Sequence, residues 1–81
     1  MTESRCEMAE RHVRQGREIV RRQRELVAEI KARGLKSKTE ESLLVAFERS
    51  LALFEWDLET VRREAIRRNE RSRAPVTEAG T

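Results

Sequence analysis

The sequence predicts an all-α protein of two long antiparallel helices, a coiled-coil-like helical hairpin that dimerises to a four-helix bundle. Two features indicate the hairpin. Apolar residues recur at alternating steps of three and four in two long segments, which is the spacing of a helix face that packs on another helix. Between these segments a helix-stop signal is followed almost at once by a helix-start signal. So short a connection places the two helices side by side and antiparallel.

The first helix is predicted over residues 4–33 and begins with a capping box. Ser4 is followed three residues later by Glu7, so that the serine oxygen and the glutamate carboxylate can each accept from a free backbone N–H. Ile19 and Leu26 flank the apolar stripe of this helix and widen it, which suits a bundle of three or four helices. The stripe residues that we expect in the hairpin core are Val13, Gly16, Val20, Gln23, Val27 and Ile30.

Two residues of this stripe are unusual for a helix contact. Gly16 costs roughly 1 kcal/mol of helix stability against alanine, so its place on the stripe indicates close approach by a bulky side chain, Phe54 or Trp56. Gln23 is polar, and a polar residue on such a stripe is expected to fix the register of the two helices.

The turn is predicted over residues 34–38. Gly34 can adopt the left-handed conformation just past the last helical residue, with Leu35 folding back on Ile30 as in a Schellman cap. Ser37 and Glu40 then repeat the spacing of a capping box and start the second helix.

The second helix is predicted over residues 39–72. Arginines replace its apolar pattern after Ile66, and Pro75 should lie beyond its end, because proline lacks the backbone donor and restricts the residue before it. We therefore expect one domain over residues 1–73, followed by a flexible tail at 74–81. The core residues expected from the second helix are Leu44, Phe47, Leu51, Phe54, Leu58 and Val61.

A second apolar set lies on another face of the second helix, where one partner helix cannot cover it. Val45, Leu53 and Trp56 form its main part. A chain of 81 residues buries a modest fraction of its surface, and oligomerisation is a common remedy. We therefore expect these three residues to be the candidate interface of a homodimer, or of a contact with another helical protein.

The charges follow the hairpin. Lysine and arginine together number 18 and aspartate and glutamate 15, for a net charge of +3. In an antiparallel pair, residues face one another when their numbers sum to about 73. This places Glu3, Glu7 and Glu10 beside the arginine run at residues 62–71. It also brings together Arg14 and Arg17 with Glu55, Asp57 and Glu59.

A basic protein with a pI near 9.7 raises the question of nucleic acid. Two features argue against nucleic acid as the partner. Glutamates interleave with the arginines, and the basic segment contains no aromatic side chain for stacking. The chain also shows no zinc-finger, RNP or helix-turn-helix pattern. A solvated, salt-bridged surface is therefore favoured, and binding to nucleic acid is the alternative.

No residue pattern indicates catalysis, a metal or a cofactor. His12 has no second histidine or nucleophile at helical spacing, and Cys6 is the single cysteine, which excludes a disulfide within the chain. Glu55 and Glu59 share an outer face, but no Glu-x-x-His motif accompanies them. We also expect a cytoplasmic location, since residues 1–20 lack the apolar run of a signal peptide and no segment has the length of a membrane span.

Residues 12–30 (HVRQGREIVRRQRELVAEI), then Gly34 with Ser37, and residues 43–53 (LLVAFERSLAL) carry a resemblance to known sequences. The chain resembles a group of short, uncharacterised bacterial proteins of soil and plant-associated proteobacteria. These share an H-V-x-x-G pattern, a G-x-x-[ST] turn and an L-L-x-x-F-E segment. The resemblance covers roughly residues 9–61. It implies a bacterial helical hairpin, and no activity or cofactor.

The function expected from the sequence is that of a small non-enzymatic module for protein–protein interaction or self-assembly. The alternative is a nucleic-acid-associated accessory protein that uses its arginine-rich helix surfaces. The two differ in salt dependence, because binding to phosphates weakens steeply with salt whereas an apolar interface does not.

Overall fold

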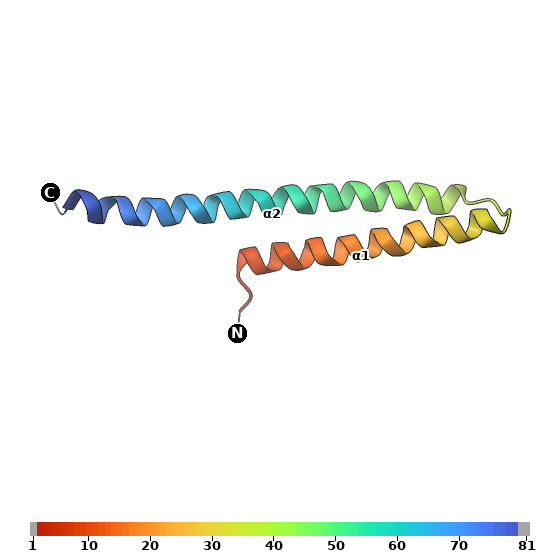
Figure 1. Ribbon diagram of the computed structural model, residues 1–81, viewed down its shortest axis with the longest axis horizontal. Coiled ribbons are helices and arrows are strands. Elements are labelled where there is room, and N and C mark those ends of the chain that lie inside the picture. Colours follow the sequence, from red (N-terminus) through yellow and green to blue (C-terminus); the bar gives the residue numbers. More distant parts are fainter. Residues whose placement is uncertain (1, 80–81) are drawn as a thin grey trace.

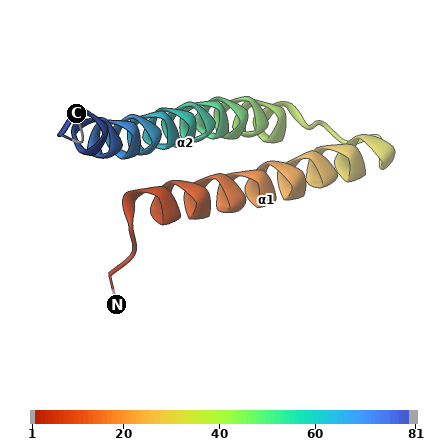
Figure 2. The ribbon, with the colours of Figure 1, turned by 60° about the vertical axis from the view of Figure 1, so that its left-hand side comes forward.

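The fold is a hairpin of two helices, as predicted. The computed structural model describes residues 2–79, with side chains as far as residue 71. Helix α1 (Arg5–Ala32) and helix α2 (Lys38–Ala79) run side by side in opposite directions, and the chain reverses between them at residues 33–37 (Figures 1 and 2). No strand occurs in the part of the chain that the structure describes.

Both ends of α1 are capped. The Glu7 N–H donates to Ser4 Oγ at 3.1 Å, and the Ser4 N–H donates to the Glu7 carboxylate at 3.0 Å, which is the expected capping box. At the other end Gly34 has a φ of 72°, and its N–H donates to the carbonyl of Lys31. The Leu35 N–H donates to the carbonyl of Ile30 at 3.1 Å, which completes a Schellman cap.

The start of α2 differs from the prediction. Ser37 Oγ donates to the carboxylate of Glu41 at 2.9 Å, and no bond joins Ser37 to Glu40 as a capping box requires. Glu41 also forms an ion pair at 2.9 Å with Lys31 at the end of α1. Because its carboxylate contacts both Ser37 and Lys31, Glu41 connects the turn to the first helix. Lys31 is distant in sequence from the start of α2, so a local capping pattern does not predict this contact.

The end of α2 lies further along the chain than predicted. The helix continues through Pro75 to Ala79, so that most of the predicted tail is helical, while residues 80–81 lie outside the described residues. The missing N–H of Pro75 deprives only the carbonyl of Arg71 of its helical donor. At the exposed end of a helix, water can satisfy that carbonyl. The residue before a proline prefers a non-helical conformation, but this preference has known exceptions.

The core lies along the contact between the two helices and consists mostly of small side chains. Gly16 and Gln23 are buried there on the α1 side. The buried apolar residues of the described chain are Ala9, Val13, Val20, Val27, Leu58 and Val61. The other predicted core residues are half-buried (Ile30, Leu44, Phe47 and Leu51) or, in one case, 36% exposed (Phe54).

Gly16 gives α2 a close approach to α1, as expected, but Trp56 takes no part in it. A Cβ atom added at Gly16 would lie 3.1 Å from Leu51 Cδ1 and 3.5 Å from Phe54 Cδ2. The Phe54 ring extends to the edge of the contact, where its centroid lies 5.3 Å from that of His12. The ring therefore packs against α1 with one side and leaves the other exposed.

Gln23 links the two helices with a hydrogen bond. Its Nε2 atom donates to the main-chain carbonyl of Glu40, in the first turn of α2, at 2.9 Å. Because this carbonyl occupies one place along α2, the bond favours a single register of the two helices, which is the role expected for a polar residue on the stripe.

The hairpin is elongated and unequal. It measures 73 × 24 × 14 Å, with a radius of gyration of 20.2 Å, against about 12 Å for a compact domain of this length. Helix α2 is longer than α1, 42 residues against 28, and its C-terminal end projects past the start of α1 (Figure 1).

Gly16 and Gly34 should respond differently to alanine. Gly34→Ala places a Cβ at a positive φ, and we expect it to lower the free energy of unfolding by about 1–2 kcal/mol. Gly16→Ala is the matched control. It gains roughly 1 kcal/mol of helix propensity, offset by a tight contact with a movable Leu51 methyl group, so the net change should stay below about 1 kcal/mol. Urea unfolding followed by circular dichroism measures both, and equal losses would contradict this account.

Candidate interaction surfaces

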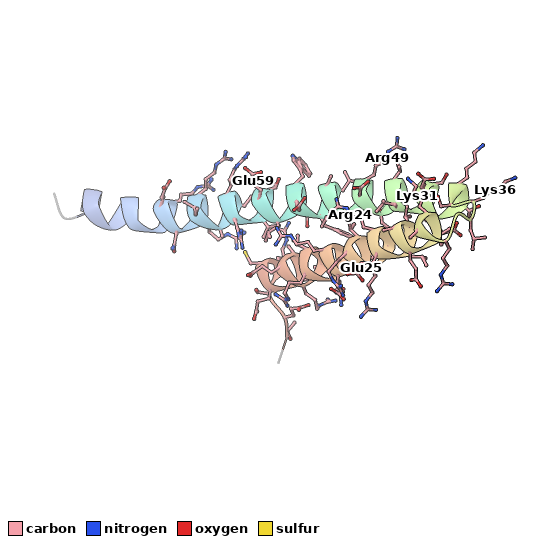
Figure 3. The ribbon with its side chains drawn as sticks, turned by 45° about the vertical axis from the view of Figure 1, so that its right-hand side comes forward. Arg24, Glu25, Lys31, Lys36, Arg49 and Glu59 are labelled. Carbon is pink, nitrogen blue, oxygen red and sulfur yellow. The ribbon has the colours of Figure 1, made fainter. Side chains whose placement is uncertain are left out.

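One flank of the hairpin carries a ladder of ion pairs between the helices, which we call the charged flank. Its members recur every seven residues on each helix, and the two numbers of each pair sum to 72, close to the predicted 73. In Figure 3, Arg24 and Lys31 of this ladder extend from α1 toward α2. The four pairs are Glu10–Arg62 (3.8 Å), Arg17–Glu55 (3.3 Å), Arg24–Glu48 (2.9 Å) and Lys31–Glu41 (2.9 Å).

The ladder favours the antiparallel arrangement over its alternatives. Basic residues predominate on the α1 side and acidic residues on the α2 side, and the one reversed pair, Glu10–Arg62, lies at the end away from the turn. A shift of one heptad would leave charges unpaired or bring like charges together. Each pair is well exposed and contributes little by itself, so the ladder acts on register more than on total stability.

The opposite flank is largely uncharged, and we call it the uncharged flank. The ion pair Arg5–Glu64 marks its far end and shows which residues of the two helices meet there. Counting in heptads from that pair brings Ile19 beside Ser50 and Leu26 beside Leu43. The same counting brings Asp57 beside His12, and it places Arg22 and Glu29, at heptad spacing from Met8 and Gln15, along the outer edge of α1. The flank consists of Met8, His12, Gln15, Ile19 and Leu26 of α1 with Leu43, Ala46, Ser50 and Leu53 of α2.

The face of α2 that is turned away from α1 carries the predicted interface residues. Leu53 is 67% exposed, Trp56 65% and Val45 46%. Arg49 lies among them and points away from α1 (Figure 3). Leu53 lies at the border between this outer face and the uncharged flank, so the two apolar surfaces are continuous.

The arginine run at residues 62–71 meets one of the three glutamates predicted to lie beside it, Glu10, which pairs with Arg62. Glu3 pairs with Arg11 at 2.9 Å and Glu7 is used in the cap of α1, so neither reaches the arginine run. The start of α1 still lies beside Arg68, since one cavity is lined by Ser4, Arg5 and Cys6 together with Arg68. A shallow cavity there is lined by Glu64, Arg67, Arg68 and Arg71.

The residues considered for catalysis are not gathered into a site. His12 contacts the ring of Phe54, and Cys6 is half-buried at the start of α1. Glu55 forms its ion pair across the helices, whereas Glu59 pairs with Arg63 on its own helix. Within the described residues no group of histidine, cysteine or acidic side chains could hold a metal ion.

Electrostatic interactions within α1 are concentrated at Glu18. Hydrogen bonds from Arg21 and then Arg22 lower the pKa of Glu18 to about 2. Glu41 is similar at the turn, where hydrogen bonds from Lys31 and then Ser37 lower the pKa of its carboxyl below the usual value. In each case a neighbouring cation favours the ionised form.

Comparison of the chain with protein-family models, with curated proteins and with solved structures gives no match. The helices in the described part of the chain also lack the apolar length that is needed to cross a membrane.

The shifted carboxyl groups predict a loss of stability in acid. Because the pKa of Glu18 is depressed in the folded chain, its contribution is complete above about pH 4.5 and disappears as the pH falls to about 2. Glu18→Gln should therefore melt below the wild type at about pH 6 and together with it near pH 2. Thermal unfolding at both pH values tests this, and a difference that does not change with pH would contradict it.

Proposed function

We propose that the protein is a small non-enzymatic self-assembly module that acts as a homodimer of hairpins. The observation that carries the proposal is the exposure of Leu53 and Trp56, each about two-thirds accessible, on a hairpin that cannot cover them itself. Large apolar side chains grouped on a surface are characteristic of protein–protein contacts.

The total surface supports association. The chain exposes 6896 Å², whereas a compact monomer of 9.5 kDa is expected to expose about 5,000 Å². A standard interface buries about 800 Å² on each partner. Pairing two hairpins would therefore remove a large part of the excess, at about 25 cal/mol for each Å² of apolar surface.

The core supports the same conclusion. Its fully covered side chains are small, and its larger ones, such as Phe47 and Leu51, are only half-buried. A second hairpin is the simplest source of further cover, because a chain of this size has no third helix to supply it.

A second candidate function is association with nucleic acid through the free end of α2. Arg67 and Arg71 lie toward the C-terminal end of α2, two of the glutamates predicted beside them, Glu3 and Glu7, are engaged elsewhere, and such cations can contact phosphates. If this function is correct, an Arg67→Glu, Arg71→Glu double variant should bind a labelled DNA duplex much more weakly than the wild type in fluorescence anisotropy at low salt. Equal binding of the two proteins would exclude it.

Light scattering during size exclusion tests the self-assembly proposal. We expect the mass of a dimer at low salt and also at about 0.5 M salt, because an apolar contact is not screened. A Leu53→Ala, Trp56→Ala double variant should elute as a monomer with its helix content unchanged, since neither side chain packs in the hairpin core.

Ile66→Ala is the matched control, because Ile66 is similarly exposed on α2 but lies away from the patch. It should remain dimeric. A wild-type monomer at both salt concentrations would overturn the proposal, and a dimeric double variant would remove Leu53 and Trp56 from the interface.

A further inference from the structure

We infer that the second copy packs on the uncharged flank, so that both helices of each hairpin enter the contact and Ile19 and Leu26 of α1 are buried in it. The inference rests on the proposed self-assembly and specifies its geometry. The sequence alone places the interface on α2; the structure extends it across to α1.

The contrast between the two flanks is the first argument. The charged flank carries four ion pairs between the helices, and covering it would remove eight charged groups from water at a cost that their attraction seldom offsets. Interface cores are depleted of charge. Between the turn and the Arg5–Glu64 pair, no ion pair that joins the two helices lies on the uncharged flank within the described residues; Asp57 lies there beside His12, and Arg22 and Glu29 lie along its outer edge on α1.

A second copy of the hairpin is the occupant that fits this flank. An uncharged face requires a partner face that is also uncharged and of similar length, and the hairpin carries one such face of its own. In a two-fold dimer the same patch meets itself. Leucines predominate at both ends of the α2 part of the flank, at Leu43 and Leu53, while Ala46 and Ser50 between them leave room for side chains of the other copy.

The area of the flank is also of the size that a dimer contact needs. From Met8 to Leu26, at 1.5 Å per residue, the flank is about 27 Å long, and two adjacent helices make it about 20 Å wide. The footprint is therefore about 540 Å², about two-thirds of the roughly 800 Å² per partner of a standard interface. A contact made by the outer face of α2 alone would be half as wide and would leave Ile19 and Leu26, 45% and 42% exposed, uncovered.

Leu53 connects this geometry with the exposed patch on α2. Because it lies where the outer face meets the uncharged flank, it falls inside a contact on the flank, with Trp56 at the rim. A large aromatic side chain at the rim can fold over the edge of the partner and exclude water there.

Substitutions on α1 test the inference. Ile19→Glu and Leu26→Glu each place a carboxylate on the flank, and we expect the dissociation constant of the dimer to rise at least about 100-fold. Ala28→Glu is the control, because it makes the same change at an exposed apolar residue of α1 on the charged side. It should leave the dimer intact. Sedimentation equilibrium measures the dissociation constant of each variant, and circular dichroism checks that its helices persist.

Cross-linking gives a second test that does not depend on a charge in the interface. In a Cys6→Ser background, Ile19→Cys should yield covalent dimers with a short bifunctional maleimide, whereas Ala28→Cys should not. Dimers from both positions, or from Ala28→Cys alone, would contradict the placement.

The outcomes separate the inference from the function on which it rests. If Ile19→Glu and Leu26→Glu stay dimeric while the Leu53, Trp56 variant dissociates, self-assembly stands and the flank is not its interface. If all three variants stay dimeric, the contact lies elsewhere on the hairpin. If the wild type is a monomer, both proposals are wrong.

Discussion

Two helices can bury only the stripe along which they touch, and the rest of this structure follows from that limit. The stripe of α1 is built from small residues, with Gly16 at the point where Leu51 and Phe54 come closest. This brings the helices together but leaves the wide side chains of α2 only half covered. The protein therefore has a well-specified hairpin and an incomplete core, and the unburied apolar residues collect on one flank and one outer face.

Specificity and stability come from different parts of the molecule. The two caps of α1, the Gln23 bond to Glu40 and the ladder of ion pairs fix where the chain turns and how the helices align. None of these contacts buries much apolar surface. Apolar cover has to come from outside the hairpin, and burial costs least on the uncharged flank, where no ion pair joins the helices between the turn and Arg5–Glu64.

The sequence predicts the parts of the fold that depend on local chemistry. Ser4 with Glu7 and Gly34 with Leu35 act where the pattern indicates, and the residue numbers of the interhelical ion pairs sum to 69–72, close to the predicted 73. Ser37 failed as a cap because Glu41 also serves Lys31, a contact that only the folded hairpin creates. Recognising the uncharged flank also required the register, since Ile19 and Leu43 belong to one surface only once the helices are aligned.

The dependence of thermal stability on protein concentration tests the central claim most directly. If the hairpin is completed by a second copy, folding and association are linked, and the melting temperature should rise steadily as the protein concentration is raised over about a hundredfold range. A melting temperature that stays constant over that range would show that the single hairpin is stable without cover, and would contradict the account.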